Sequence, residues 1–211
     1  MTHIVLAGDS VFDNGVYVPG QPDVVRQLRA ALPAGAQASL VALDGAVVRD
    51  VPRQIATLPA DTTHLVISAG GNDALSQEWM LGRPSRLVSD SLDLFADLRG
   101  AFRQDYVAML DAALAQGVPV TACAIYDPRF PDADRQRRAV TALAFFNDII
   151  LRECFLRGIA LLDLRLICSE AGDFANPIEP SAQGGEKIAA AIAAMALERS
   201  TRGARVVTGR S

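Results

Sequence analysis

The stretch that decides the fold is Ile4-Val-Leu-Ala-Gly-Asp-Ser-Val-Phe-Asp-Asn-Gly15. Apolar residues lead directly into Gly8, Asp9 and Ser10, which is typical of a short buried strand that stops at a tight turn. In an open parallel sheet, ligands bind beyond the carboxyl ends of the strands. We therefore expect the hydroxyl of Ser10 to face a crevice at that edge of the sheet.

Strand-like runs and helix-patterned segments alternate along the rest of the chain. The predicted strands are His3–Gly8, Gln37–Leu43, Thr63–Ala69, Val118–Ile125 and Ile159–Leu164. The predicted helices are Asp23–Leu32, Val48–Leu58, Phe95–Gln116, Asp134–Arg157 and Gly184–Glu198. Such alternation implies a parallel sheet that is covered by helices on both faces. The expected fold class is α/β, a flavodoxin-like three-layer α/β/α sandwich with strand order 2-1-3-4-5.

Length, charge and hydropathy limit the possible partners. A chain of 211 residues favours one domain, which we expect to span residues 1–198, with the basic segment 199–211 as a flexible tail. The formal net charge of −4 argues against a nucleic-acid or anionic-membrane partner. A predicted strand begins almost at once, which leaves no room for a signal peptide, and no apolar run is long enough to span a bilayer. The expected location is the cytoplasm.

The three cysteines, Cys123, Cys154 and Cys168, are well spaced and odd in number. This pattern predicts neither a zinc site nor a disulfide framework, and it fits a reducing compartment. Cys123 lies in an apolar run, so we expect it in the core. No metal or organic cofactor is implied by the sequence.

Two further turns follow predicted strands and supply hydrogen-bond donors. Asp44-Gly45-Ala46 follows the second strand, where a glycine can leave its N–H pointing outward. Gly70-Gly71-Asn72-Asp73 follows the third strand, and Asn72 can present its side-chain amide there. Each turn alone is also compatible with an ordinary strand end. Together with the N–H of Ser10, they supply the converging donors that the oxyanion of a tetrahedral intermediate needs.

Other residues around this edge have less specific predicted roles. The irregular segments Ser76–Asp93 and Tyr126–Asp134 both follow strands, so we expect them at the catalytic edge. They are candidates for shaping a pocket, and ordinary surface connection is the alternative. Asp9 and Asp73 are expected to accept hydrogen bonds that stabilise turns. Asp13 and Asn14 are further candidates for the lining of the pocket.

The motifs, taken in order, resemble those of the SGNH (GDSL-type) hydrolases. They are Gly8-Asp9-Ser10, Gly45, Gly70-Gly71-Asn72-Asp73 and the late segment Pro180-Ser-Ala-Gln-Gly-Gly185. The resemblance runs from Ile4 to about Ala194. It implies a nucleophile at Ser10, an oxyanion hole formed by Ser10, Gly45 and Asn72, hydrolysis of esters or acyl groups, and the same sandwich fold.

The last block departs from the pattern of that family. The family has Asp-x-x-His-Pro, which supplies the general base and its orienting acid, whereas this chain has Asn176-Pro-Ile-Glu-Pro180. Glu179 thus stands at the His position and Asn176 at the Asp position. The two histidines, His3 and His64, start predicted strands and lie roughly 20 Å or more from the catalytic edge at about 3.3 Å per residue. Neither is expected to reach Ser10.

Glu179 is therefore the candidate base, because a carboxylate can accept the Ser10 proton and return it to a leaving alkoxide. An unperturbed Glu titrates at about 4.3 and a His at about 6.5, and burial would narrow that gap. Asn176 is expected to donate to the Glu179 carboxylate, with Asp173 as the alternative third member. The opposing interpretation makes Glu179 a surface carboxylate near the N-terminus of the last helix.

The sequence thus predicts a serine esterase or acyl hydrolase that acts on small carboxylic esters or acetyl groups. Its predicted partner is a small-molecule ester, with no nucleic acid and no membrane. The alternative is a catalytically impaired protein of the same fold that binds a small acyl or carboxylate ligand. A nucleotide-binding role is disfavoured, because the first turn lacks both the phosphate-loop and the dinucleotide glycine patterns.

Overall fold

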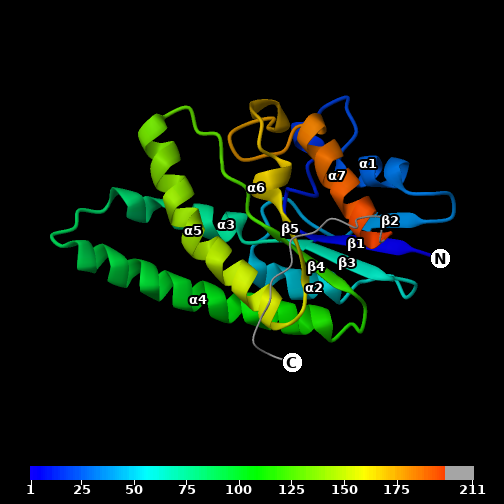
Figure 1. Ribbon diagram of the computed structural model, residues 1–211, viewed down its shortest axis with the longest axis horizontal. Coiled ribbons are helices and arrows are strands. Elements are labelled where there is room, and N and C mark those ends of the chain that lie inside the picture. Colours follow the sequence, from blue (N-terminus) through cyan, green and yellow to red (C-terminus); the bar gives the residue numbers. More distant parts are fainter. Residues whose placement is uncertain (198–211) are drawn as a thin grey trace.

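The computed structural model describes residues 1–197. Its centre is a five-stranded parallel sheet in the order β2-β1-β3-β4-β5 (Figure 1), which confirms the predicted fold class and strand order. The strands are β1 (His3–Gly8), β2 (Gln37–Leu40), β3 (His64–Ser68), β4 (Val120–Ala124) and β5 (Ala160–Asp163). The predicted tail, residues 199–211, lies outside the described residues.

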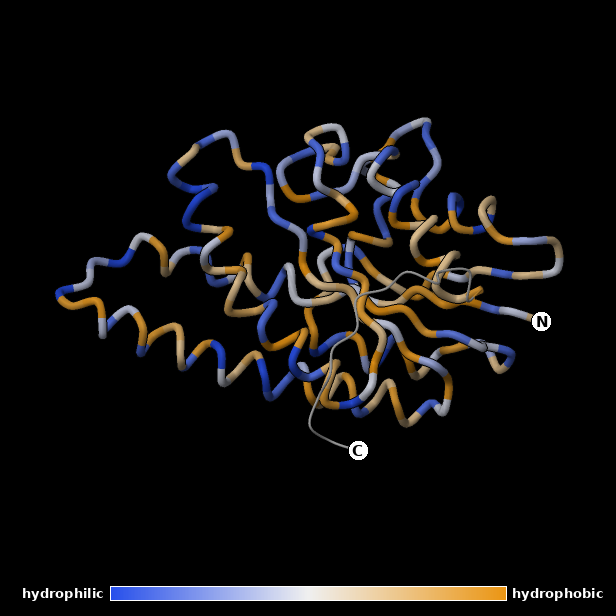
Figure 2. The backbone as a smooth tube through the Cα atoms, viewed as in Figure 1, coloured by the Kyte–Doolittle hydropathy of each residue, from blue (hydrophilic) through white to orange (hydrophobic). Residues whose placement is uncertain are grey.

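Helices cover both faces of the sheet (Figure 1). They are α1 (Val24–Ala31), α2 (Val51–Ile55), α3 (Gly71–Ser76), α4 (Val88–Leu114), α5 (Ala133–Leu156), α6 (Leu164–Ile167) and α7 (Ala182–Ala196). Successive side chains of a strand point to opposite faces. Ile4 and Leu6 of β1 pack with α1 and α7, whereas Ala7 packs in the cluster that includes α2, α4 and α5. Figure 2 shows the hydrophobic strands gathered at the centre between these layers.

The segment Ser76–Asp93 is more regular than predicted. It contains the end of α3, the short 3-10 helix η3 (Glu78–Gly82) and the first residues of α4, which begins at Val88 instead of Phe95. Val88 is 78% exposed and Leu92 is 55% exposed, so the first turns of α4 carry no buried apolar stripe that a periodicity analysis would detect. The Asp90 carboxylate accepts a hydrogen bond from the Leu87 N–H at 3.1 Å, which caps the helix locally.

The predictions on cysteines and membrane segments can be compared with the described residues. Cys123, Cys154 and Cys168 are all buried and free, and Cys123 lies in the core as expected. Burial raises the pKa of the Cys154 and Cys168 thiols to about 12, so both are protonated at neutral pH. Within residues 1–197, no helix combines the length and apolar character that crossing a membrane requires.

Candidate active site

The first turn owes its shape to Gly8. Gly8 has φ +122°, and a Cβ atom at this position would lie 1.7 Å from the carbonyl oxygen of Ser68. The Asp9 N–H donates to that carbonyl at 3.0 Å, so β1 ends in close contact with β3. The Gln54 side chain accepts from the Gly8 N–H at 2.7 Å and donates to its carbonyl at 2.9 Å. These contacts place Ser10 just beyond the carboxyl end of β1.

Ser10 and Glu179 meet in a buried pair. The Ser10 Oγ donates to Glu179 Oε1 at 3.1 Å, and the two residues are 6% and 5% exposed. Glu179 Oε2 has no hydrogen-bond partner among the described residues. Burial raises the pKa of Glu179 from 4.5 to about 7, against the hydrogen bond from Ser10 and with a smaller contribution from the Asp44 charge. Glu179 is therefore not the surface carboxylate of the opposing interpretation.

Asn176 holds the loop of Glu179 through its backbone. Its Oδ1 accepts from the N–H groups of Ile178 at 2.9 Å and Glu179 at 3.0 Å. The Tyr126 hydroxyl donates to the Ile178 carbonyl at 2.6 Å from the other side. The expected hydrogen bond from the Asn176 amide to the Glu179 carboxylate is not formed, because the Asn side chain folds back on its own turn.

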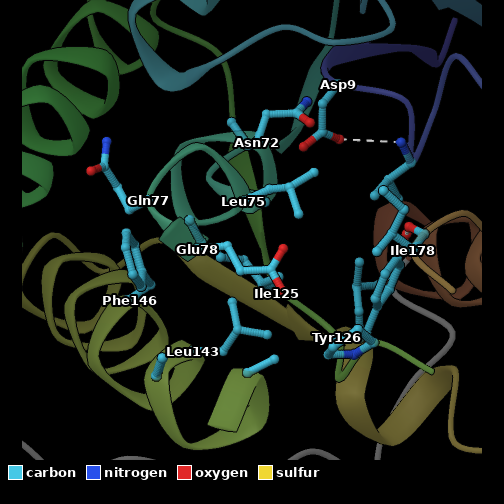
Figure 3. A pocket seen from close by; sticks show the side chains of 18 of the residues that line it. Asp9, Asn72, Leu75, Gln77, Glu78, Ile125, Tyr126, Leu143, Phe146 and Ile178 are labelled. Atoms are coloured by element: carbon cyan, nitrogen blue, oxygen red, sulfur yellow. Dashed lines mark hydrogen bonds between the residues drawn. The ribbon is translucent and has the colours of Figure 1, made fainter. Parts of the chain in front are cut away.

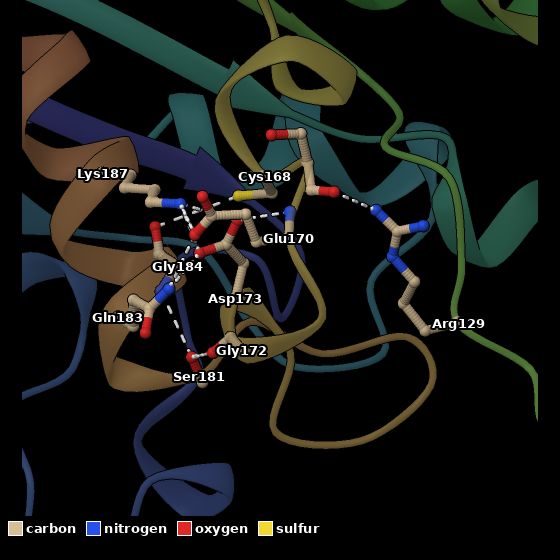
Figure 4. Close-up of polar contacts among 10 residues, drawn as sticks. Arg129, Cys168, Glu170, Gly172, Asp173, Ser181, Gln183, Gly184 and Lys187 are labelled. Carbon is tan, nitrogen blue, oxygen red and sulfur yellow. Dashed lines mark hydrogen bonds and ion pairs between the residues drawn. The ribbon is translucent and has the colours of Figure 1, made fainter.

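Asp173 is not the third member of the site either. Its carboxylate lies 2.8 Å from Lys187 Nζ and accepts hydrogen bonds from Glu170 N at 2.9 Å and Gln183 Nε2 at 3.0 Å (Figure 4). Although burial opposes the charge, the Lys187 ammonium and these donors lower the pKa of Asp173. Asp173 therefore anchors the start of α7 beneath the loop that carries Glu179.

The three predicted oxyanion donors lie on neighbouring turns. Gly45 occupies the exposed loop after β2 with φ +77°. Asn72, in the first turn of α3, donates one amide hydrogen to the Ala46 carbonyl at 3.0 Å, which joins α3 to that loop. Within residues 1–197, no hydrogen bond uses the backbone N–H of Ser10 or Gly45. These two groups and the second amide hydrogen of Asn72 remain available to a ligand.

The carboxylates near the first turn have separate roles. Asp9 accepts from the Val11 N–H at 3.2 Å within its own turn, as predicted. Asp73 instead accepts from the Val48 N–H at 3.0 Å, so it joins α3 to the segment before α2 and does not stabilise its own turn. Asp9 is also buried beside Ser10, and burial raises its pKa to about 7. The site thus contains two carboxyl groups that titrate near neutral pH.

Asp13 and Asn14 brace the turn and do not line the cavity, contrary to the prediction. The Asp13 carboxylate accepts from the Asp44 N–H at 3.0 Å. Asn14 is fully buried, accepts from the Val24 N–H at 3.0 Å and donates to the Pro180 carbonyl at 3.2 Å. Because Pro180 follows Glu179, Asn14 ties the serine turn to the loop of the base.

Both histidines lie at the opposite end of the sheet from Ser10, as predicted. His3 and His64 are the first residues of β1 and β3. His3 Nδ1 lies 2.9 Å from Asp61 Oδ1, and its Nε2 lies 2.8 Å from the Ser39 hydroxyl. Neither imidazole is available to accept a proton from Ser10.

A cavity of about 110 Å³ is lined by Ser10 and Glu179. Figure 3 shows it from close by, with Asp9 and Asn72 among the labelled lining residues. Its polar lining includes Asp9, Ser10 and Asn72, and Gly45 lies outside it. Both irregular segments contribute to its wall, as predicted, through Gln77, Glu78, Leu81, Pro128 and Phe130. The rest of the wall is mainly apolar and includes Leu98, Ile125, Leu143 and Phe146.

The sequence did not predict that α5 would line this cavity. Ala139, Ala142, Leu143 and Phe146 all line it. Their spacing of i, i+3, i+4 and i+7 marks one face of a helix, a signal that a helix packed in the core would give equally. Only the position of α5 relative to Ser10 shows that this face forms part of a cavity.

An ion pair joins two elements of the cavity wall. Arg135, at the start of α5, donates to Glu78 Oε1 at 2.5 Å and to Oε2 at 2.8 Å. Its guanidinium also lies 3.7 Å from the centroid of the Phe130 ring. Because Glu78 and Phe130 are lining residues, this contact joins η3 to α5 across the wall.

The fold and the position of the site define a three-layer α/β/α protein of the SGNH hydrolase type. The chain belongs to the GDSL-like lipase/acylhydrolase family, whose family model matches residues 6–187. Hydrolases of this family act on ester bonds. No curated protein matches this chain.

Several solved structures share the fold. An extracellular lipase from Streptomyces rimosus is 19% identical, with a TM-score of 0.66, over 95% of this chain and 100% of that chain. A carbohydrate acetylesterase from Sinorhizobium meliloti is 14% identical, with a TM-score of 0.65, over 95% of this chain and 100% of that chain. An inhibitor-bound aryl esterase from M. smegmatis is 14% identical, with a TM-score of 0.65, over 94% of this chain and 99% of that chain.

Proposed function

We propose that this protein is a serine esterase or acyl hydrolase in which Ser10 is the nucleophile and Glu179 is the general base. The observation that carries the proposal is the hydrogen bond of 3.1 Å from Ser10 Oγ to Glu179 Oε1 in a buried site. Glu179, with its pKa raised to about 7, titrates near neutral pH. A base of that pKa combines a populated carboxylate with useful proton affinity.

The reaction has two steps. Ser10 Oγ attacks the ester carbonyl while its proton passes to Glu179, and the protonated Glu179 returns that proton to the leaving alkoxide to give an acyl-serine. In the second step, Glu179 takes a proton from water, whose oxygen attacks the acyl carbon, and the proton then returns to Ser10 as the carboxylic acid leaves. Asn176 and Tyr126 act as positioning residues for Glu179.

The negative charge that develops on the carbonyl oxygen needs donors in both steps. The backbone N–H groups of Ser10 and Gly45 and the amide of Asn72 would supply them. One oxyanion donor of this kind typically lowers the barrier by roughly 3 kcal/mol. That contribution is comparable to the proton-affinity difference of roughly 3 kcal/mol between an unperturbed Glu and a His.

The size of the cavity favours a short acyl group. Its volume of about 110 Å³ is smaller than an engineered cavity of about 150 Å³ that holds benzene. An acetyl or butanoyl chain is of that size, and the apolar lining suits it. The similar structure from Sinorhizobium meliloti is named as a carbohydrate acetylesterase, which also supports a short acyl group.

The test is hydrolysis of p-nitrophenyl acetate by the purified protein. Ser10→Ala should abolish turnover, and Glu179→Gln should lower kcat/KM by about tenfold or more, within the range for general-base catalysis. Glu186→Gln makes the same chemical change at an exposed site on α7 and should leave the rate unchanged. Undiminished activity in Ser10→Ala would refute the mechanism.

The catalytically impaired alternative has its own outcome. If the protein is catalytically impaired, the parent will not turn over the ester, but its melting temperature will rise with acetate or butanoate.

A series of p-nitrophenyl esters tests the acyl site. We expect acetate and butanoate to exceed octanoate, and Leu143→Ala to shift the preference toward longer chains, because it removes volume from the cavity wall.

A further inference from the structure

A second hollow lies next to the catalytic cavity, between the loop before α4 and the first half of α5. Its volume is about 640 Å³. Four arginines line it, Arg83 and Arg86 on one side and Arg137 and Arg138 on α5. We call this hollow the arginine groove.

The arginines are poorly neutralised by their neighbours. Asp90 is the carboxylate that lines the groove, and it already accepts the hydrogen bond from Leu87 N at 3.1 Å. In the described part of the chain, the ion pairs of the groove arginines are limited to exposed Asp134, whose oxygens lie 3.6 Å from Arg137 and 3.8 Å from Arg138. Four positive charges therefore face one lining carboxylate, and such a cluster attracts anions whatever the net charge of the chain.

The floor of the groove is apolar. It consists of Met80, Leu81, Leu94, Phe95, Ala142 and Phe145. Phe95 and Phe145 stack with their ring centroids 4.9 Å apart. Leu81, Phe95 and Ala142 also line the catalytic cavity, so the two hollows share a wall. A ligand in the groove would meet charge at the rim and apolar surface below.

We propose that the arginine groove binds a small organic phosphate, with the phosphate on the arginines and an apolar chain on the floor. The planar guanidinium presents paired donors that match the oxygens of a phosphate. Contact with the apolar floor would favour binding in proportion to the apolar area of the ligand that it removes from water. This site is separate from the Ser10 chemistry and does not depend on the proposed hydrolysis.

The only tryptophan of the chain, Trp79, reports on this site. The Arg83 guanidinium lies 5.7 Å from the centroid of its ring, so a ligand that engages Arg83 should change the Trp79 emission. We would titrate the full-length protein with n-octyl phosphate, below its micelle-forming concentration, and record the fluorescence. The expected result is a saturable change that weakens in high salt, because exposed charge pairs are screened.

Variants then locate the binding. Arg137→Ala/Arg138→Ala should weaken binding by about tenfold or more, since it removes two charge-assisted contacts. Arg26→Ala/Arg152→Ala removes two exposed arginines outside the groove and should leave binding unchanged. Arg86→Ala provides a second test from the opposite wall. Thermal unfolding of each variant verifies that the fold is retained.

Three outcomes would overturn the proposal. One is equal affinity of the groove variants and the control variant for n-octyl phosphate. Another is equal affinity of the parent for inorganic phosphate and n-octyl phosphate, which would remove any role for the apolar floor. The last is a signal only above the micelle-forming concentration or only with phosphatidylglycerol vesicles, which would indicate a lipid surface instead of a single bound molecule.

Discussion

Raising the pH from 4.5 to 7 should destabilise this protein through the carboxyl group of Glu179. Burial raises the pKa of this group from 4.5 to about 7 in the folded protein. The difference of about 2.5 units corresponds to about 3.5 kcal/mol in full, at about 1.4 kcal/mol per unit, of which about 3 kcal/mol falls between pH 4.5 and 8. The folded protein keeps the proton to higher pH than the unfolded chain does. This contribution to stability is therefore fully present below pH 4.5 and is lost as the pH rises through about 7.

Denaturation by urea measures this effect. We would determine the free energy of unfolding at intervals from about pH 4.5 to about pH 8 for the parent and for Glu179→Gln, which cannot ionise. The parent should lose about 3 kcal/mol more than the variant over this range. Asp9, whose pKa is also raised to about 7, contributes in the same direction to both proteins. Because the Glu179 charge is only a smaller cause of the Asp9 shift, behind burial, the difference reports chiefly on Glu179.

The control and the activity profile sharpen this test. Glu186→Gln should follow the parent, because its carboxyl is exposed. In the active protein, kcat/KM for a neutral ester should rise with pH to a plateau above about 7, as the base loses its proton. Identical pH dependence of stability in the parent and in Glu179→Gln would refute the claim that burial raises the pKa of Glu179. A rate that already reaches its plateau near pH 5 would refute its role as base.

Three further variants test the surroundings of the site. Gly8→Ala should lower the melting temperature severely or prevent folding, since its Cβ would lie 1.7 Å from the Ser68 carbonyl oxygen, and circular dichroism would detect this. Asn72→Ala should lower kcat by about a hundredfold with little change in KM, as loss of an oxyanion donor does; an unchanged kcat would remove Asn72 from the site. Tyr126→Phe loses the hydrogen bond to the Ile178 carbonyl and should cost about 1 kcal/mol of stability. Its kcat should fall more than its KM changes if Tyr126 positions the base, whereas a purely structural residue would leave kcat unchanged.

The local pattern of the sequence was sufficient to predict the sheet. Buried strands followed by Gly and Asp, and helices that end at glycine, depend on neighbours in the chain, so their order was readable before any contact was known. The same reasoning placed both histidines at the wrong end of the sheet for catalysis and left Glu179 as the candidate. It failed at the start of α4, because exposed Val88 and Leu92 carry no periodic burial signal. The predicted cytoplasmic location stays a prediction.

Only the tertiary structure decided the properties that depend on residues far apart in the chain. The Ser10–Glu179 contact joins positions 169 residues apart, and burial in the packed site raises the pKa of that carboxyl against the Ser10 hydrogen bond. Asn176 donates nothing to the Glu179 carboxylate, because its side chain folds back on its own turn. Net charge likewise could not show that four arginines gather in one groove. The sequence by itself determined which elements form and which edge carries Ser10, because these follow from local pattern; proximity, desolvation and local charge follow from packing.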